Sequence, residues 1–346
     1  MTDMTSVLQD QVRVAADTGA GLNIVGAGTK TGLGRAAQGQ TLSLLEHKGV
    51  ISYSPTELVI QVRSGTTVTE LNSILAEQKQ RLVFDPPVFN DQATIGGSVA
   101  ANQSGSSRPW VGGVRDSLLG VGLINGTGEH LHFGGQVMKN VAGFDVSRCQ
   151  VGAMGTLGVI TEVSLKVLPQ YEADATLVFA ASVADALQMM PQYMQRNLPV
   201  TSVCYWQGKL YVRLQGSTAG VDSIVSAGDG SVLAQDAAIA LWHQLREYKL
   251  LDATTEQVLW RSNVAATDAL VMCTDDCLLN WAGSQRWQLL PADQAGPEQA
   301  IQFMGGDRQG EVNGELNSVA RQLQGRLKKA FDPHSVFNSG RLYSWM

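Results

Sequence analysis

The chain has 346 residues, 44% of them hydrophobic and 16% charged, and its formal net charge is −6. This length suffices for two domains with ordinary buried cores. Because binding to nucleic acid needs a basic stripe that neutralises phosphates, the acidic balance argues against a nucleic-acid partner. No apolar run approaches the ~18 residues of a membrane-spanning helix, and the N-terminus lacks a charged segment followed by an apolar core. We therefore expect no transmembrane segment and no signal peptide.

The first half of the chain predicts short helices and strands separated by glycine-rich loops. Thr67 and Glu70 stand at the spacing of a capping box, which predicts the start of a helix. Alternating residues on both sides of Asn125–Gly128 predict a hairpin. The expected helices cover residues 1–20 and 66–80, and the expected strands lie within residues 22–25, 41–46, 49–65, 117–135 and 155–169, the last range as a strand pair.

The composition changes after Pro169, where glycine becomes rarer and tryptophan more frequent. Helical patterns cover residues 183–197, 236–251 and 319–333, and residues 209–216 predict a strand. We place a domain boundary near residue 170. The tryptophans of the second half fit a docking face or core packing, and core packing is slightly favoured; they are Trp206, Trp242, Trp260, Trp281 and Trp287.

Two glycine-rich stretches, Gly26–Gly34 and Thr94–Gly105, carry the clearest chemical signal. Glycine permits positive φ and close approach of the backbone, and successive N–H groups in such a loop form an anion-binding concavity. The spacing Gly26-x-Gly28-x-x-x-Gly32 is one residue too long for the dinucleotide-binding fingerprint. The residues that follow are also too rich in glycine to form the helix that this fingerprint requires.

Two N–H-rich loops, neither of them tied to the start of a helix, suit one large ligand with a diphosphate at its middle. Asn102, Ser104 and Ser106 add neutral hydrogen-bonding groups for the polar edges of a heterocycle. A plain glycine turn explains the first loop alone but not the pair. The sequence therefore predicts a flat, phosphate-bearing cofactor that lies against the backbone.

Metal-ligating residues give a weaker signal. Cys273 and Cys277 are too few for a zinc or iron–sulfur site, and we expect the cysteines Cys149, Cys204, Cys273 and Cys277 to be reduced thiols. His130 and His132 share one face of a hairpin strand and could ligate a metal, but an exposed polar face is the favoured interpretation. We therefore expect no metal site.

An enzyme that removes a proton from a substrate with a carboxylate needs a base for the proton and a cation for the carboxylate. We find no convincing cluster of this kind, so the catalytic residues stay unknown. Arg213 alternates with apolar residues on an expected strand, so its side chain faces away from theirs. The sequence does not decide whether this side chain faces the cofactor or the solvent. Candidate cations are Arg108, Arg115, Lys139, Arg213 and Arg341, with Arg115 also able to pair with Asp116 on the surface.

Four ordered segments carry a family resemblance, and they lie at residues 24–34, 85–105, 113–169 and 331–343. They begin "IVGAGTKTGLG", "DPPVFNDQATIGG", "GVRDSLLGVGLINGTGEH" and "FDPHSVFNSGRLY". The chain resembles the flavoproteins of the vanillyl-alcohol-oxidase/PCMH type, and within them the smaller FAD-binding subunits of bacterial glycolate oxidase (glycolate dehydrogenase). The resemblance extends over nearly the whole chain.

The resemblance implies an α+β fold. It places a two-subdomain, PCMH-type FAD-binding domain at residues 1–170, an α+β cap domain at 171–325 and a tail at 326–346 that returns to the FAD domain. The residues expected to bind FAD are Gly26, Ala27, Gly28, Thr29, Lys30 and Thr31 at the diphosphate, Pro87, Ile95, Gly96 and Gly97 on its other side, Asn102, Ser104, Gly105 and Ser106 beside the ribityl and flavin, Gly158, Val159 and Ile160 at the adenine, and Asn338 and Arg341 over the flavin.

The chain departs from the family pattern at two places. Many relatives attach FAD through a histidine in the first glycine loop, and residues 28–32 contain no histidine. We therefore expect noncovalent FAD. Residues 337–341 lack the proline that family members usually carry before the glycine, which makes this loop less stiff.

The resemblance implies an enzyme subunit: the FAD-binding subunit of a heteromeric glycolate oxidase that oxidises glycolate to glyoxylate. A second flavin subunit and an iron–sulfur subunit would complete the complex, since this chain has no motif for a cluster with four cysteine ligands. Two alternatives stay open, a non-catalytic FAD-containing assembly subunit and an independent FAD-dependent 2-hydroxy-acid dehydrogenase. We expect a cytoplasmic location, either free or peripheral on the inner membrane through the complex.

Overall fold

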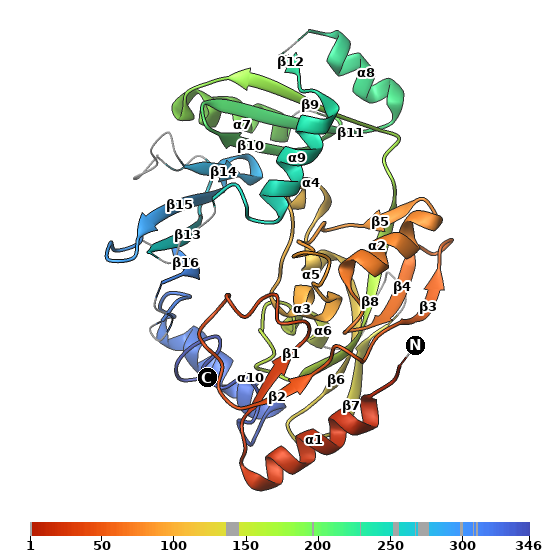
Figure 1. Ribbon diagram of the computed structural model, residues 1–346, viewed down its shortest axis with the longest axis vertical. Coiled ribbons are helices and arrows are strands. Elements are labelled where there is room, and N and C mark those ends of the chain that lie inside the picture. The colour runs from red at the N-terminus through yellow and green to blue at the C-terminus, as the bar shows by residue number, and fades with distance from the viewer. Residues whose placement is uncertain are drawn as a thin grey trace. The chain divides into compact units, whose positions relative to one another are not determined.

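The computed structural model describes residues 2–135, 145–195, 197–228, 230–251, 256–266, 268, 277–297, 300–306, 308 and 311–346 (Figure 1). These residues fall into two compact units. The first unit comprises Met1–Gln103, Gly113–Pro169 and Arg308–Met346, and the second comprises Ser104–Gly112 and Gln170–Asp307. The short segment Ser104–Gly112 thus belongs with the second half of the chain, and the C-terminal segment joins the first unit from Arg308. That the second unit acts as a cap stays a prediction.

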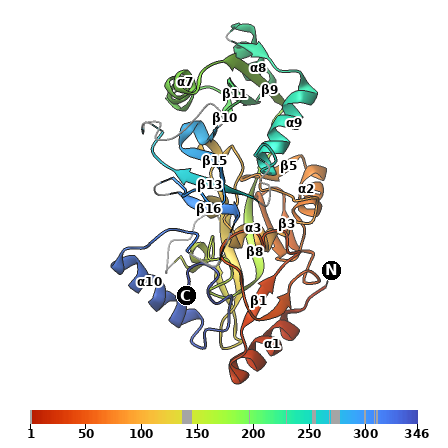
Figure 2. The same cartoon turned by 60° about the vertical axis from the view of Figure 1, so that its left-hand side comes forward.

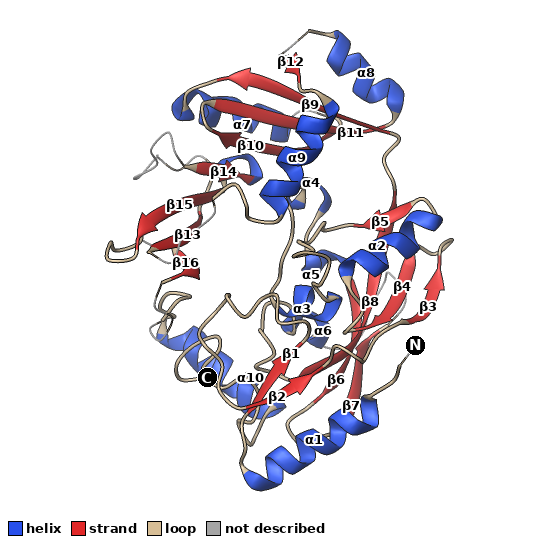
Figure 3. Cartoon of the chain, in the orientation of Figure 1, coloured by secondary structure: helices blue, strands red, loops and turns tan. Residues whose placement is uncertain are grey.

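The first unit combines helices with mostly antiparallel strands (Figure 3). Its helices are α1 (Thr5–Thr18), α2 (Val68–Glu77), α3 (Ile95–Ala100), α5 (Val114–Ser117), α6 (Val146–Cys149) and α10 (Ser318–Phe331). Its strands are β1 (Leu22–Val25), β2 (Gln40–Ser43), β3 (Val50–Ser54), β4 (Val59–Arg63), β5 (Gln80–Leu82), β6 (Leu118–Ile124), β7 (His130–Gly134) and β8 (Val159–Pro169).

The antiparallel sheet of this unit has the order β3-β4-β8-β6-β7, and β5 pairs with β8 as well. Residues 155–169 were expected to form a strand pair, and this prediction is wrong, because β8 is a single strand with β4 on one side and β6 on the other. Val163, Leu165 and Val167 of β8 are fully buried. Their alternation continues without turn residues as far as Pro169, so the chain has no place to reverse.

A separate parallel pair, β1 with β2, carries the first glycine loop between its strands. Leu8, Val12 and Ala15 of α1 pack in one core cluster with Leu22 of β1 and Ile124 of β6. Val7 and Val14, which the helical pattern also included, are exposed. The helix therefore fixes β1 against the main sheet through one narrow apolar stripe.

The C-terminal segment returns to β1. Leu22 and Phe337 form a parallel bridge, and Figures 1 and 2 both show the blue C-terminal segment beside the red β1. Lys328 and Asp332 form a buried ion pair at 2.7 Å, and the ammonium of Lys328 also donates to the carbonyls of Thr156 and Phe337. The Asp332 carboxylate accepts from the backbone N–H groups of Val336 and Phe337. This pair thus fixes the turn that leads from α10 to β1.

The second unit is built on a sheet of order β12-β9-β11-β10-β14-β15-β13-β16. Its strands are β9 (Ala173–Ala180), β10 (Val200–Trp206), β11 (Lys209–Gly216), β12 (Ser231–Val232), β13 (Gln257–Asn263), β14 (Leu278–Asn280), β15 (Gln285–Pro291) and β16 (Ile301–Gly305). Its helices are α4 (Arg108–Val111), α7 (Val183–Gln195), α8 (Thr218–Ser226), α9 (Gln235–Arg246) and the 3-10 turn η1 (Trp281–Gly283).

Helices cover both faces of the β9-β11-β10 part of this sheet. Apolar residues of α7 and α8 pack in one cluster with Leu177, Val203 and Val212. On the opposite face, the indole of Trp242 in α9 donates to the hydroxyl of Thr176 at 2.9 Å. Trp242 and Trp287 are buried, which agrees with core packing for these two tryptophans.

Among the described residues, no helix combines the length and the apolar character that crossing a bilayer requires.

Replacing Asp332 by Ala should lower the free energy of unfolding by about 3–5 kcal/mol, because removal of one partner leaves a buried charge without compensation. Urea denaturation measures this change. Lys329, exposed on the same helix, is the matched control, and Lys329→Ala should change stability by no more than about 0.5 kcal/mol. Equal effects of the two substitutions would contradict a stabilising role for the buried pair.

Candidate functional site

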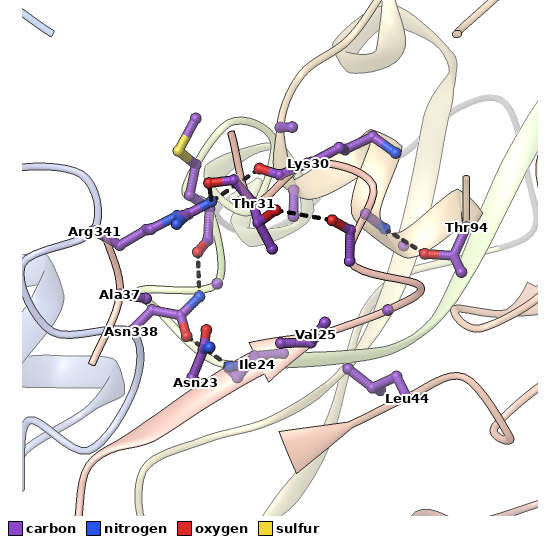
Figure 4. Close-up of a pocket in the computed structure, with 18 of the residues that line it drawn as sticks. Asn23, Ile24, Val25, Lys30, Thr31, Ala37, Leu44, Thr94, Asn338 and Arg341 are labelled. Atoms are coloured by element: carbon purple, nitrogen blue, oxygen red, sulfur yellow. Dashed lines mark hydrogen bonds between the residues drawn. The ribbon is translucent and has the colours of Figure 1, made fainter. Parts of the chain in front are cut away.

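The first unit contains a cavity of about 310 Å³ at the carboxyl end of β1. The first glycine loop, the start of α3, the start of β8 and the C-terminal segment all contribute to its wall (Figure 4). The wall residues lie within three parts of the chain, residues 23–101, 154–160 and 338–341, and these three chain segments meet in one pocket. A volume of this order lies at the lower end of the range for ligand and cofactor sites.

The two glycine-rich stretches lie directly against each other in this pocket. A Cβ atom on Gly26 would lie 2.4 Å from the hydroxyl oxygen of Thr94, closer than real contacts allow. A Cβ atom on Gly96 would lie 2.4 Å from the Cβ atom of Ser64 and 3.0 Å from its carbonyl oxygen. Side chains are thus excluded at both positions because neighbouring protein atoms already occupy the space.

The second stretch was expected to be a loop without a helix start, and that interpretation is wrong. Thr94 is the N-cap of α3, and its hydroxyl accepts from the backbone N–H of Gly97 at 3.3 Å. A capping threonine contributes about 1 kcal/mol, comparable with the cost of a glycine within a helix. Full burial of Ile95 and Val99 supplies the rest of the stabilisation.

The C-terminal segment holds the first glycine loop in place through two side chains (Figure 4). The amide oxygen of Asn338 accepts from the backbone N–H of Ile24 at 2.7 Å, and its amide nitrogen donates to the carbonyl of Met154 at 2.6 Å. The guanidinium of Arg341 donates to the carbonyl of Lys30 at 2.9 Å, and also to the carbonyls of Thr31 and Arg35. The loop therefore has a fixed shape before a ligand arrives.

The pocket carries positive charge. The ammonium of Lys30 lies 5.3 Å from the ring centroid of Phe89, and it would lie 3.7 Å from a Cβ atom on Gly97. Burial lowers the pKa of the Arg341 guanidinium. Burial, together with the charge of Arg341, lowers the pKa of Arg308 to about 10, and Arg308 donates to the carbonyl of Gly34. Lys30 and Arg341 both line the pocket, so the pocket favours an anion.

Most of the residues expected to bind FAD line the pocket, and each of the three chain segments contributes. They are Gly26, Ala27, Gly28, Thr29, Lys30, Thr31, Gly96, Gly97, Gly158, Ile160, Asn338 and Arg341. The others are not part of the wall. Ile95 and Val159 are fully buried in the core, Pro87 is also buried, and the side chain of Asn102 lies against Gly152. Ser104, Gly105 and Ser106 belong to the second unit.

A further set of wall residues, most of them apolar, was not predicted from the sequence. They are Asn23, Ile24, Val25, Leu33, Ala36, Ala37, Leu44, Ser64, Thr94, Ala100, Ala101, Met154 and Gly155. Thr94 is a residue type favoured at a helix start, but Gly97 stands where a capping box has Glu or Gln, so the sequence gave only a weak signal for Thr94. The apolar residues gave none, because a wall position and a core position look alike in sequence.

The candidate cations outside the pocket have other contacts. The guanidinium of Arg213 is bound by the carboxylate of Asp174 and lies 5.6 Å from the Trp242 ring. Arg108 lies 4.7 Å from the Trp281 ring. Asp116 accepts from the backbone N–H of Gly113 at 2.8 Å, which gives it a role at the start of α5. Lys139 lies outside the described residues, as does Cys273.

The pocket fits FAD on its own geometry. The backbone of Gly26–Thr31 lines the pocket, and Lys30 and Arg341, which also line it, match the charge of a diphosphate. The buried hydroxyl of Ser64, which lines the pocket, has no hydrogen-bond partner among the described residues. A bound cofactor with polar edges would satisfy it.

Replacing Arg341 by Lys should raise the dissociation constant of FAD, because a single ammonium lacks the planar fork whose two nitrogens reach Arg35 on one side and Lys30 and Thr31 on the other. Loss of one such charged hydrogen bond, about 1.5–3 kcal/mol, corresponds to at least a tenfold rise. Titration of FAD followed by quenching of its fluorescence measures this change. Arg326→Lys, at an exposed site on α10, is the control, and an unchanged dissociation constant for Arg341→Lys would refute this role.

Comparisons with known proteins agree with this geometry. Residues 4–134 match a family described as an FAD binding domain. Among solved structures, p-cresol methylhydroxylase with substrate bound has a TM-score of 0.75 at 15% identity, covering 99% of this chain and 87% of that one. The 4-ethylphenol oxidase of Gulosibacter chungangensis has a TM-score of 0.72 at 14% identity, covering 99% and 88%. At such low identity these structures show the fold alone, and they confirm the expected PCMH-type α+β fold.

Curated relatives match this chain over its full length in one case and over about half of it in two others. Glycolate oxidase subunit GlcE of Escherichia coli (strain K12) is 36% identical over 347 aligned residues, covering 99% of this chain and 98% of that protein. D-lactate dehydrogenase of Anaerostipes hadrus is 30% identical over 177 residues, covering 50% of this chain and 37% of that one. Glycolate oxidase subunit GlcD of Bacillus subtilis (strain 168) is 31% identical over 170 residues, covering 49% and 34%. The chain therefore belongs to the GlcE family of FAD-dependent oxidoreductase subunits.

Proposed function

We propose that this chain is the FAD-binding subunit of a heteromeric glycolate oxidase. The observation that carries this proposal is the 36% identity to glycolate oxidase subunit GlcE across 99% of the chain. The pocket residues support it, because they come from both the N-terminal and the C-terminal parts of the region aligned with GlcE. In the proposed reaction, glycolate loses two electrons and two protons to become glyoxylate, and a partner iron–sulfur subunit receives the electrons.

FAD, when bound, supplies the two-electron acceptor of the reaction. The chain's own residues bind and orient it: the loop at Gly26–Thr31 and the start of α3 hold the diphosphate, and Arg341 and Asn338 fix the loop. The described residues of the pocket wall include no His, Cys or Tyr, which supports noncovalent attachment.

Partners follow from the chemistry that this chain lacks. Its sequence has no motif for a cluster with four cysteine ligands, and Cys204 and Cys277 are buried. Electrons therefore leave through another protein, for which we propose an iron–sulfur subunit beside a second flavin subunit. We place this complex in the cytoplasm or peripherally on the inner membrane.

The pairing of Arg213 with Asp174 favours a relay role over an independent dehydrogenase. The carboxylate of Asp174 accepts from both Nε and Nη2 of Arg213, so it already balances the charge that a substrate carboxylate would need. Glycolate added to the isolated chain should therefore leave the flavin absorbance near 450 nm unchanged. Bleaching of this band by glycolate alone would instead support the independent 2-hydroxy-acid dehydrogenase.

Reconstitution of the complex tests the role of this flavin. We expect the complex that contains Arg341→Lys to assemble normally and to lose glycolate-dependent reduction of an electron acceptor in proportion to the flavin lost from this subunit. Size-exclusion chromatography checks assembly, and Arg326→Lys is the control. Full activity of a complex whose subunit has lost its FAD would refute the redox role and support the assembly subunit.

A further inference from the structure

A cross-strand row in the first unit brings a histidine and a glutamate together over a glycine. Gly122 of β6 lies opposite His132 of β7 on one side and opposite Glu162 of β8 on the other. Neighbouring strands lie about 4.8 Å apart, so His132 and Glu162 start from backbones about 9.6 Å apart. The ring nitrogen Nε2 of His132 nevertheless lies 2.5 Å from Oε1 of Glu162.

This meeting depends on the glycine. A Cβ atom on Gly122 would lie 2.5 Å from Cγ of Glu162 and 2.9 Å from its Oε1. Any other residue at position 122 would therefore push the carboxylate away from the histidine. The central strand is thus shaped to let side chains from both neighbouring strands converge.

His130 completes the group from the same face of β7. Its ring centroid lies 4.6 Å from that of His132. The pairing of β6 with β8 shifts between Gly122 and Leu123, which leaves Thr161 as an extra residue in β8. The Thr161 hydroxyl lies 2.9 Å from Nε2 of His130 and orients this ring. One ligand atom from each of His130, His132 and Glu162 lies within 4.8 Å of the other two.

Burial and charge separate this group from an ordinary surface ion pair. The Glu162 side chain is only 14% exposed, whereas that of His132 is 61% exposed. Glu162 therefore presents its carboxylate from a covered position toward an open side. Arg63 of β4 lies opposite Glu162 in the same cross-strand row. Its guanidinium is bound by the carboxylate of Asp3 at 3.0 Å.

We propose that His130, His132 and Glu162 bind one divalent transition-metal ion of the zinc class, which links β7 to β8 across Gly122. Zinc binds imidazole nitrogen and carboxylate oxygen at about 2.0–2.2 Å, so tetrahedral ligand atoms lie about 3.3 Å apart. The ligand atoms lie within 4.8 Å of one another, so no pair has to approach by more than about 1.5 Å to reach that spacing. Water occupies the fourth position, because the site opens toward solvent at His132.

The sequence favoured an exposed polar face for His130 and His132, and we propose the metal site in place of that interpretation. It does not depend on the proposed glycolate oxidase function. The ion stabilises the first unit, since a ligand that binds only the folded chain shifts unfolding by mass action. Its effect is greatest at β7, which ends the sheet order.

The test uses the full chain without a histidine tag, stripped with EDTA and then dialysed. Titration with Co²⁺, followed by visible absorbance and displaced with Zn²⁺, gives the stoichiometry and the affinity. We expect one Zn²⁺ per chain and a rise in the thermal unfolding midpoint with Zn²⁺. His132→Ala and Glu162→Gln should each weaken the affinity by roughly 10–100-fold or more, since changes to outer partners of a ligand already cost that much.

His243→Ala is the matched control, because His243 is exposed on α9 in the second unit. It should bind Zn²⁺ as tightly as the unsubstituted chain. Circular dichroism of His132→Ala confirms folding, which its exposed side chain allows. The proposal is overturned if the unsubstituted chain shows no saturable binding or if His132→Ala keeps full affinity. A thiolate-to-cobalt charge-transfer band would equally overturn it, because that band assigns the ion to cysteine.

Discussion

The contact between Gly26 and Thr94 is the constraint on which the cofactor pocket depends. The hydroxyl of Thr94 occupies the space that a side chain at position 26 would need. The same hydroxyl caps α3 by accepting from Gly97. One threonine therefore fixes both the approach of the first glycine loop and the start of the helix that faces it. The two segments can lie side by side in the pocket wall because position 26 has no side chain.

The C-terminal segment holds the first glycine loop in this position through hydrogen bonds. Asn338 bonds both Ile24 and Met154, and Arg341 bonds the carbonyls of the glycine loop. The buried pair of Lys328 and Asp332 holds the preceding turn. A pocket that is formed before its ligand arrives loses less entropy when the ligand binds. The last residues of the chain thus set the shape of a loop more than 300 residues earlier, as the separations of these hydrogen-bonded pairs show.

Glycine serves a second purpose at Gly122 in β6, between β7 and β8 of the main sheet. There the missing side chain admits His132 and Glu162 from the two neighbouring strands. At Gly26 and Gly96, the missing side chains admit backbone and hydroxyl groups instead. At all three positions glycine is required because neighbouring atoms occupy the space that a side chain would need, and not because the backbone has a positive φ.

The sequence by itself predicted a phosphate-bearing cofactor from its residues, and it predicted the PCMH-type fold, FAD and the family through its resemblance to known flavoproteins. Long, ordered segments such as residues 85–105 and 113–169 carry that resemblance, because many residues matched in order are more specific than one short motif. It also located the first glycine loop and the helix start at Thr67, whose capping spacing is local.

The sequence did not determine that Thr94 begins a helix, since two glycines in its first turn outweigh the cap on propensity alone. Only the tertiary structure decided this, through burial of Ile95 and Val99. Tertiary structure alone also decided which apolar residues line the pocket and which partner Arg213 has. Contacts between residues far apart in the sequence leave no periodic trace within either segment, so the pairing of Gly122 with His132 and Glu162 becomes visible only when the strands are in register.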